Sequence, residues 1–409
     1  MSKISDLIFK NKIFLKNILL NIIGFTLITG TVQLILYPFL SRTMEQSEYG
    51  LAITLIGFSN VFTIVFGNAL TNTRLRQQSI YEKKNITGDF NLLFISSVIM
   101  NMILVVVLSY AYDNNINILD LFLLASMSFF AHFRAYFSVH FRLYLNFKQV
   151  LIMNMICSIG YIIGMQLSKA IGIWQVSFLT GELAGAVYIF FKNKIIKESL
   201  KITSLFKPTT TTYLSMVLLL MLRNITVYAD RLLIYPMLGG NEVAVYYTSV
   251  FFGKTIGTIA TPIAGVILSH YSKKTVITRQ DFWARNVYVF LLSLSFIALI
   301  LMLGRPITAI FYPTLIDQAL PYLNLANLAA IIFFSSVMIY PAIIKFCNIR
   351  GQLILQGITV VIYILTSYIL IKKFELIGFC YAMLITSTLN LIMLLAFGNY
   401  SINHSKFSN

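Results

Sequence analysis

The sequence predicts an all-α polytopic membrane protein of about twelve transmembrane helices in two repeated six-helix lobes. Hydrophobic residues make up 58% of the 409 positions and charged residues only 11%. One water-soluble core could not hide that much apolar surface, so the solvent of most side chains must be lipid. Long apolar segments follow one another from Asn17 to Phe397, and two of them repeat each other.

The repeat supports the two-lobe prediction. Residues 34–40 read Leu-Ile-Leu-Tyr-Pro-Phe-Leu, and residues 232–238, an offset of 198 positions, read Leu-Leu-Ile-Tyr-Pro-Met-Leu. The same offset carries Tyr49 onto Tyr247. A duplicated chain that lies wholly in the membrane is the layout of transporters whose halves rock around a central cavity.

The apolar segments define about twelve spans, with bounds loose by several residues. We expect an N-terminal lobe at residues 1–191 (spans 1–6), a linker at 192–208 and a C-terminal lobe at 209–409 (spans 7–12). The longest polar connections, 71–89, 192–207 and 272–286, are too short for a second domain. The spans are predicted at 17–40, 49–70, 90–112, 118–141, 150–168, 174–191, 211–238, 243–271, 287–311, 321–344, 353–371 and 376–397.

The distribution of positive charge predicts the sidedness. The formal net charge of +17 would suggest nucleic acid in a soluble protein. Here most Lys and Arg lie at the start of the chain and in alternate loops, which predicts that these loops and both termini are cytoplasmic and that no nucleic acid binds. The first span has a basic start but no cleavage site behind a short apolar core, so we expect it to be retained. The clusters lie at 3–16, 74–84, 142–148, 192–207, 273–285 and 345–350.

No motif of a catalytic, metal or cofactor site is visible. The sequence lacks a phosphate-binding Gly-rich loop with Lys, a serine elbow and a His and Cys cluster of metal spacing. Cys157, Cys347 and Cys380 have no paired spacing and are interpreted as packing residues. We therefore expect neither enzymatic activity nor a cofactor.

Two cations are predicted near the bilayer midplane. Arg223 lies ten residues beyond Tyr213 in the seventh span, which places it ~15 Å deep, and Lys254 lies ~16 Å from the opposite face at Val243. Each such cation costs roughly 3 kcal/mol at a helix centre, so two at one depth indicate a polar cavity for an anionic ligand. The alternative is a buried pair with other partners.

Four further charged residues are candidates for the site. Asp230 and Arg231 follow Arg223 by seven and eight residues, near the outer interface. They either bind substrate or are structural, with Arg231 reaching the interface and Asp230 pairing with Arg223 along the helix. Arg134 either contacts the ligand or reaches the cytoplasmic interface. Glu182 and Asp230 are candidates for proton or cation coupling, although Glu182 could instead hydrogen-bond a neighbouring helix.

The first half carries a neutral polar stripe where the second half carries charge. Asn21, Thr29 and Gln33 recur at multiples of four residues in the first span, and Asn60 lies on the next span. Their amide and hydroxyl groups suit hydroxyl-rich sugars, whereas an apolar drug would not require them. We therefore expect these four residues to contact substrate.

The segments that carry a family resemblance are Asn21-Ile-Ile-Gly24, Tyr37-Pro38-Phe-Leu-Ser-Arg42, Glu48-Tyr49-Gly50, Ala229-Asp230-Arg231-Leu-Leu-Ile234, Leu238-Gly239 and Val245-Tyr-Tyr247. In these segments the chain resembles the Wzx-type oligosaccharide flippases of the multidrug, oligosaccharidyl-lipid and polysaccharide exporter superfamily. The resemblance covers the whole chain in span count, and its motifs are diffuse.

The resemblance implies a bacterial inner-membrane protein that moves a polyprenyl-diphosphate-linked repeat unit of a polysaccharide, such as O-antigen or capsule, to the outer leaflet by alternating access. It also implies membrane lipid, a polysaccharide polymerase and chain-length machinery as partners. In such a protein Arg223 and Lys254 would neutralise the diphosphate, and the polar stripe would hydrogen-bond the sugars.

Two rival functions remain. The first is a drug or cation exporter of the related MATE type, although such pumps typically place acids in the cavity and the first two spans have none deep in the membrane. The second is a membrane enzyme such as a polysaccharide polymerase or acyltransferase, which would usually need a sizeable outer loop or clustered His and Asp.

Overall fold

Every regular element of the described chain is a helix. The computed structural model describes residues 2–272 and 277–404, without the side chains of residues 2–15 and of a few later positions. Over these ranges eight helices are long and apolar enough to cross a membrane. The predicted fold class, an all-α multi-pass membrane protein, is confirmed. Lys273 and Lys274 of the basic cluster at 273–285 lie outside the described residues.

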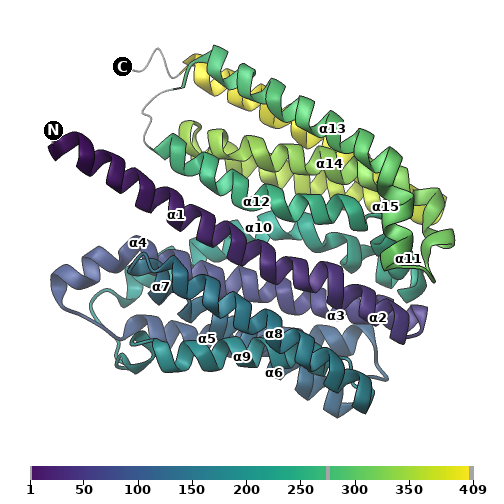
Figure 1. The fold of residues 1–409 in the computed structure, drawn as a ribbon, viewed down its shortest axis with the longest axis horizontal. Coiled ribbons are helices and arrows are strands. Elements are labelled where there is room, and N and C mark those ends of the chain that lie inside the picture. The colour runs from purple at the N-terminus through teal and green to yellow at the C-terminus, as the bar shows by residue number, and fades with distance from the viewer. Residues whose placement is uncertain (1, 273–276, 405–409) are drawn as a thin grey trace. The chain divides into compact units, whose positions relative to one another are not determined.

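Each predicted span lies in a helix or a run of helices (Figure 1). The last helix, α15, covers the last two predicted spans. A kink at Glu375, where φ is 52°, separates them. The first six spans correspond to α1 (Ser2–Thr31), η1 (Val32–Leu36) and α2 (Tyr37–Thr43); α3 (Gln46–Phe62), η2 (Thr63–Asn68) and α4 (Ala69–Lys84); α5 (Asp89–Tyr112); α6 (Ile118–Phe137) and α7 (Val139–Leu143); α8 (Phe147–Ile171); and α9 (Gln175–Lys192). The others correspond to α10 (Phe206–Leu238); α11 (Gly240–Ser249) and α12 (Phe251–Ser272); α13 (Arg279–Phe311); α14 (Ile316–Phe346); and α15 (Ile349–His404).

The polar connection predicted at 71–89 is largely helical. α4 continues through this stretch to Lys84, because Arg, Leu, Gln, Glu and Lys are good helix formers even where no apolar face directs them. The helix ends at Asn85, whose left-handed φ of 51° closes it, and Gly88 with φ of 134° precedes α5. Only four residues of the predicted loop therefore lack helical structure.

The chain packs into two compact units. The first unit contains Met1–Leu40 and Thr54–Tyr228, and the second contains Ser41–Ile53 and Ala229–Asn409. The division falls inside α10, and residues 192–208 lie wholly in the first unit. The predicted lobe bounds at 191 and 209 stay a prediction.

Glycines let α8 and α9 approach closely in the first unit (Figure 1). A Cβ on Gly160 would lie 2.9 Å from the Cα of Gly181 and 3.0 Å from the carbonyl oxygen of Thr180. The Thr180 hydroxyl donates to the carbonyl of Gly160 at 3.0 Å. Because the obstacles are mainly backbone atoms, no side chain could move aside to make room for a larger residue.

Gly160→Ala is therefore expected to lower the thermal stability of the purified protein. The added methyl forces α8 and α9 apart, which outweighs the gain in helix propensity of roughly 1 kcal/mol from replacing Gly. Thermal unfolding in detergent measures this effect. Gly30→Ala is the matched control, because a Cβ there meets nothing within 4 Å. Equal melting temperatures for the two variants would contradict the packing argument.

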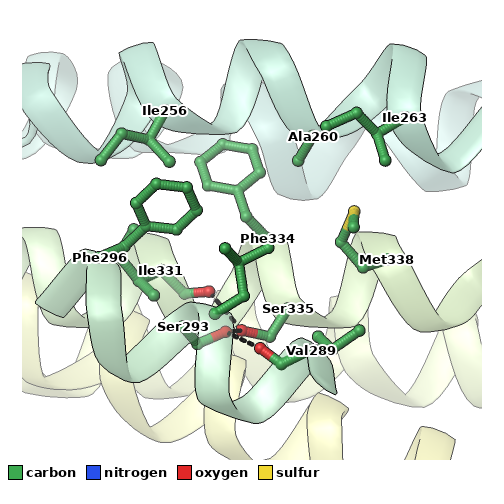
Figure 2. A pocket seen from close by; sticks show the side chains of 11 residues that line it. Ile256, Ala260, Ile263, Val289, Ser293, Phe296, Ile331, Phe334, Ser335 and Met338 are labelled. Carbon is green, nitrogen blue, oxygen red and sulfur yellow. Dashed lines mark hydrogen bonds between the residues drawn. The ribbon is translucent and has the colours of Figure 1, made fainter. Parts of the chain in front are cut away.

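The second unit contains a small apolar cavity between α12, α13 and α14 (Figure 2). Its volume is about 60 Å³. The Ser293 and Ser335 hydroxyl oxygens lie 2.6 Å apart, and they can also donate to the carbonyls of Val289 and Ile331 on their own helices. A space this small, with its hydroxyls already bonded, suits no oligosaccharide.

Candidate functional site

Three charged side chains meet in the second unit. The Lys254 ammonium of α12 donates to Oδ2 of Asp230 on α10, and the Arg231 guanidinium Nε lies 3.9 Å from Oδ1 of the same carboxylate. The side chains of Asp230 and Arg231 are 3% and 7% exposed, and that of Lys254 is 18% exposed. One acid faces two bases, so this charged cluster carries one net positive charge.

Two tyrosines of α11 lie against the cations of the cluster. The guanidinium carbon of Arg231 lies 4.8 Å from the ring centroid of Tyr247, and the Lys254 ammonium lies 4.9 Å from the same centroid. Lys254 also lies 5.8 Å from the ring centroid of Tyr246. The negative faces of aromatic rings stabilise cations that have lost water, so the tyrosines help to keep both bases charged inside the protein.

The backbone of α3 and α10 fixes the acid and Arg231. The Arg231 N–H donates to Oδ1 of Asp230 at 2.9 Å, and Arg231 Nη1 donates to the carbonyl of Ile53 at 3.3 Å. Ile53 belongs to the part of α3 that packs in the second unit. The carboxylate of Asp230 therefore accepts from a backbone amide as well as from Lys254, which holds its orientation.

Asn327 of α14 positions Lys254. The helix is interrupted at Val250, between α11 and α12. Such an interruption leaves backbone N–H and C=O groups without helical hydrogen-bond partners. The Asn327 side chain donates to the carbonyl of Ser249 at 2.8 Å and accepts from the Gly253 N–H at 2.6 Å. It thus replaces the lost bonds on both sides of the break, directly before Lys254.

The first unit holds a second buried ion pair. Arg134 of α6 donates from Nε and Nη2 to the two carboxylate oxygens of Glu182 on α9, at 2.6 and 2.8 Å. The Tyr161 hydroxyl of α8 donates to Oε1 of Glu182 at 2.5 Å. Glu182 is 8% and Arg134 21% exposed in their side chains. Both carboxylate oxygens of Glu182 therefore accept hydrogen bonds from neighbouring helices. Such bonding was the alternative to a role of Glu182 in ion coupling.

Arg223 lies on α10 in the first unit and is exposed, whereas Lys254 lies in the second unit. The structure joins Lys254 instead with Asp230 and Arg231, which the sequence places 24 and 23 positions earlier. The shared anion site of Arg223 and Lys254 stays a prediction.

The polar stripe of the first half lies in the first unit. The Thr29 hydroxyl donates to the carbonyl of Phe25 at 2.7 Å, so its hydrogen serves its own helix. Asn21, Gln33 and Asn60 are half-buried. Gln33 lies in the π-helical turn η1, and π turns inside α-helices are frequent at functional sites because they redirect side chains. Substrate contact by these four residues stays a prediction.

Sequence reasoning missed Asn327, which bonds the backbone before Lys254. It also missed Tyr161 and Tyr246 as partners of charged residues. Asn327 could have been found as a polar residue in the middle of an apolar span. Tyr247 was marked by the repeat, but not as a partner of cations. Nothing in the sequence indicates that Tyr161 faces Glu182, because that contact depends on how α8 and α9 pack.

Solved transporters share the architecture of this chain. An inward-facing MATE family multidrug resistance transporter of the MOP superfamily matches with a TM-score of 0.64 and 13% identity, over 95% of this chain and 96% of that one. The lipid II flippase MurJ in an inward closed conformation matches with a TM-score of 0.64 and 18% identity, over 95% of this chain and 87% of that one. A MATE structure in the bent conformation also reaches 0.64, with 14% identity over 97% and 96%.

The chain has the fold of these transporters. No family model and no curated protein matches the sequence. Because the identities are low, the likeness shows the fold, and both the exporter and the flippase expectations are compatible with it. The chemistry of the charged residues must separate them.

Proposed function

We propose that the chain is a flippase that moves a polyprenyl-diphosphate-linked oligosaccharide across the bacterial cytoplasmic membrane by alternating access. The observation that carries the proposal is the excess of positive charge in the Asp230, Arg231 and Lys254 cluster. A buried site with more bases than acids favours an anionic ligand, and a diphosphate supplies that charge.

The physical task fits such a site. A diphosphate and its sugars cannot cross ~30 Å of hydrocarbon unaided, since each unpaired polar group carries a penalty of several kcal/mol. In the proposal, Lys254 and Arg231 take over the role of water at the diphosphate, with Arg223 as a further cation. Asn21, Gln33 and Asn60 would serve the sugars, and the prenyl chain would remain in lipid.

A cation exporter of the MATE type is the second candidate, because the fold supports it equally. Such an exporter needs a carboxylate that a cationic drug can reach. Asp230 is paired with Lys254, and Glu182 is paired with Arg134 through both oxygens. A drug would have to displace a basic side chain from either acid, and this favours the flippase. A role of either acid in ion coupling would likewise require its pair to open.

The proposal includes location and partners. The basic clusters favour an orientation with both termini in the cytoplasm, and the resemblance to oligosaccharide flippases favours the cytoplasmic membrane. A flippase performs no covalent chemistry, so in this proposal the chain is not an enzyme. Its proposed partners are a polysaccharide polymerase and the chain-length machinery.

Cells that lack the chain are expected to accumulate the complete lipid-linked repeat unit on the cytoplasmic leaflet, with unchanged resistance to cationic dyes. The readout is extraction of lipid-linked intermediates combined with a leaflet-specific assay, and the control is the deletion strain complemented with the wild-type gene. Increased dye sensitivity without lipid accumulation would support the exporter instead. Accumulation on the outer leaflet would remove the flippase proposal.

A further inference from the structure

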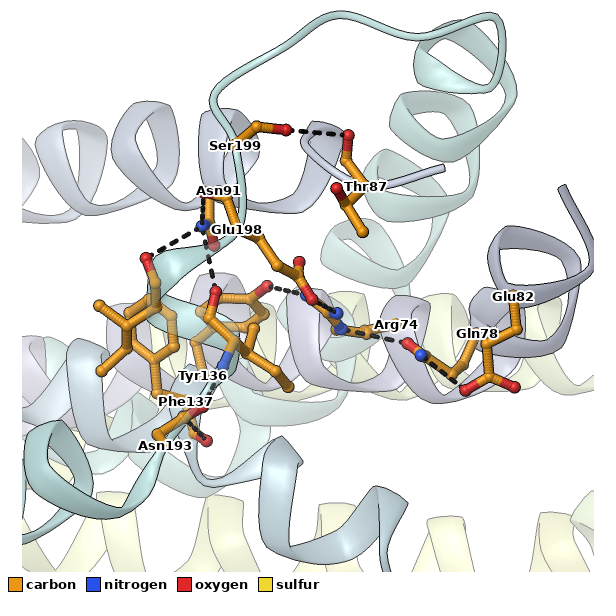
Figure 3. Close-up of polar contacts among 12 residues, drawn as sticks. Arg74, Gln78, Glu82, Thr87, Asn91, Tyr136, Phe137, Asn193, Glu198 and Ser199 are labelled. Atoms are coloured by element: carbon orange, nitrogen blue, oxygen red, sulfur yellow. Dashed lines mark hydrogen bonds and ion pairs between the residues drawn. The ribbon is translucent and has the colours of Figure 1, made fainter. Parts of the chain in front are cut away.

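The linker between α9 and α10 is held tightly against the first unit (Figure 3). Glu198 accepts from both Nη atoms of Arg74 on α4, at 2.5 and 2.8 Å, in a bidentate ion pair. The Arg74 side chain is 4% exposed. Asn91 of α5 donates to the carbonyl of Glu198 at 3.0 Å, and Asn193 donates to the carbonyl of Phe137 at 2.8 Å. The linker is therefore a fixed part of the protein surface.

Further along, the linker is fixed to the start of α5. The Thr203 N–H donates to Oδ1 of Asp89 at 2.8 Å, and the Ser199 hydroxyl donates to the carbonyl of Thr87 at 3.3 Å. A Cβ on Gly88 would lie only 2.7 Å from the carbonyl oxygen of Lys201, so the two backbones are in direct contact. The linker thus stays at the level where the helices end.

The exposed side chains of residues 190–202 are all basic or apolar. Leu200 is 57% and Ile202 is 73% exposed, and the α9 terminus before the linker exposes Phe190 by 61% and Phe191 by 78%. The one acid of residues 190–202 is Glu198, whose charge is matched by Arg74. The exposed bases among them are Lys192, Lys194, Lys197 and Lys201.

Large apolar side chains that alternate with lysines need a partner with a negative surface and an apolar interior. The segment begins at the end of α9, which carries the predicted sixth span, and it is hydrogen-bonded to the ends of other helices. The nearest such partner is therefore the membrane itself. Anionic headgroups attract lysines, and the acyl chains below them accept Leu, Ile and Phe.

We propose that residues 190–202 form an interfacial anchor that binds the anionic phospholipid headgroups of the adjacent leaflet. Leu200 and Ile202 enter the acyl boundary, and the four lysines bind lipid phosphates. The ion pair between Arg74 and Glu198 fixes the position of the anchor relative to α4. The inference is independent of the transported substrate.

The test uses the full-length protein in nanodiscs with a bimane label on Ile202→Cys. The three native cysteines are buried, and the labelled parent protein without the substitution measures their background. Access from water is measured by acrylamide quenching, and contact with lipid is measured by quenching from nitroxide-headgroup phospholipid. Discs of phosphatidylcholine alone are compared with discs that also contain phosphatidylglycerol.

We expect acrylamide quenching to fall, and nitroxide quenching to rise, several-fold when phosphatidylglycerol is present, and we expect high salt to weaken this dependence. Lys194→Gln with Lys197→Gln should weaken the dependence, because two of the four lysines lose their charge. Lys83→Gln with Lys84→Gln is the matched control, because these two lysines are also exposed in the first unit, and it should keep the dependence.

Equal access of acrylamide in both kinds of disc would overturn the proposal. Shielding that appears only after a cytosolic extract is added, and not with phosphatidylglycerol, would also overturn it and indicate a protein partner. Loss of the lipid dependence in the Lys83 and Lys84 control would show a general charge effect rather than an anchor.

Discussion

Lys254→Ala is expected to abolish export while the protein still folds and inserts. The substitution leaves one base facing one acid, so the cluster loses its positive excess and the negative charge of Asp230 is no longer outweighed. Truncating one member of a buried charge pair typically costs about 2–5 kcal/mol in binding, which is enough to stop transport. Lys254→Arg should retain part of the activity because the charge remains.

Complementation of a strain that lacks the transporter measures this effect as surface polysaccharide per unit of membrane-inserted protein. Lys169→Ala is a suitable control, because Lys169 is an exposed base near the end of α8. Normal polysaccharide from a protein with both Arg223→Ala and Lys254→Ala would contradict the assignment of these cations to the substrate.

Glu182→Ala is expected to cause a large loss of stability. Arg134 would remain inside the first unit without its bidentate partner, and removing one member of a buried pair destabilises by about 3–5 kcal/mol. Thermal unfolding in detergent should show a fall of several degrees in the melting temperature. Glu82→Ala, at an exposed acid on α4, should have little effect.

The double variant Arg134→Met with Glu182→Leu should recover most of that stability, since two apolar side chains leave no buried charge. A double variant no more stable than Glu182→Ala would show that the unpaired charge is not the cause. Normal export by a stable double variant would also exclude Glu182 from ion coupling.

Hydropathy alone was enough to predict where the long helices lie, because each predicted span needs a long apolar segment whatever its neighbours are. The repeat of residues 34–40 at 232–238 added the duplication. α4 was the exception, since a polar stretch such as 74–84 can continue a helix beyond the membrane without any apolar signal.

The candidate site was predicted only in its parts. Depth along a helix follows from counting residues, and it predicted Lys254 to be an intramembrane charge. Which helices face one another depends on packing, so the pairing of Lys254 with Asp230 and of Arg134 with Glu182 required the structure. The same holds for Asn327, whose role depends on the break at Val250.

Reconstitution into proteoliposomes tests the flippase account most directly. Liposomes that contain a fluorescently labelled polyprenyl-diphosphate oligosaccharide are treated with dithionite, which bleaches only the outer leaflet. The account predicts that wild-type protein exposes the inner-leaflet label to dithionite, whereas Lys254→Ala protein leaves it protected. Protected label with wild-type protein, together with movement of a cationic dye in the same vesicles, would contradict the account.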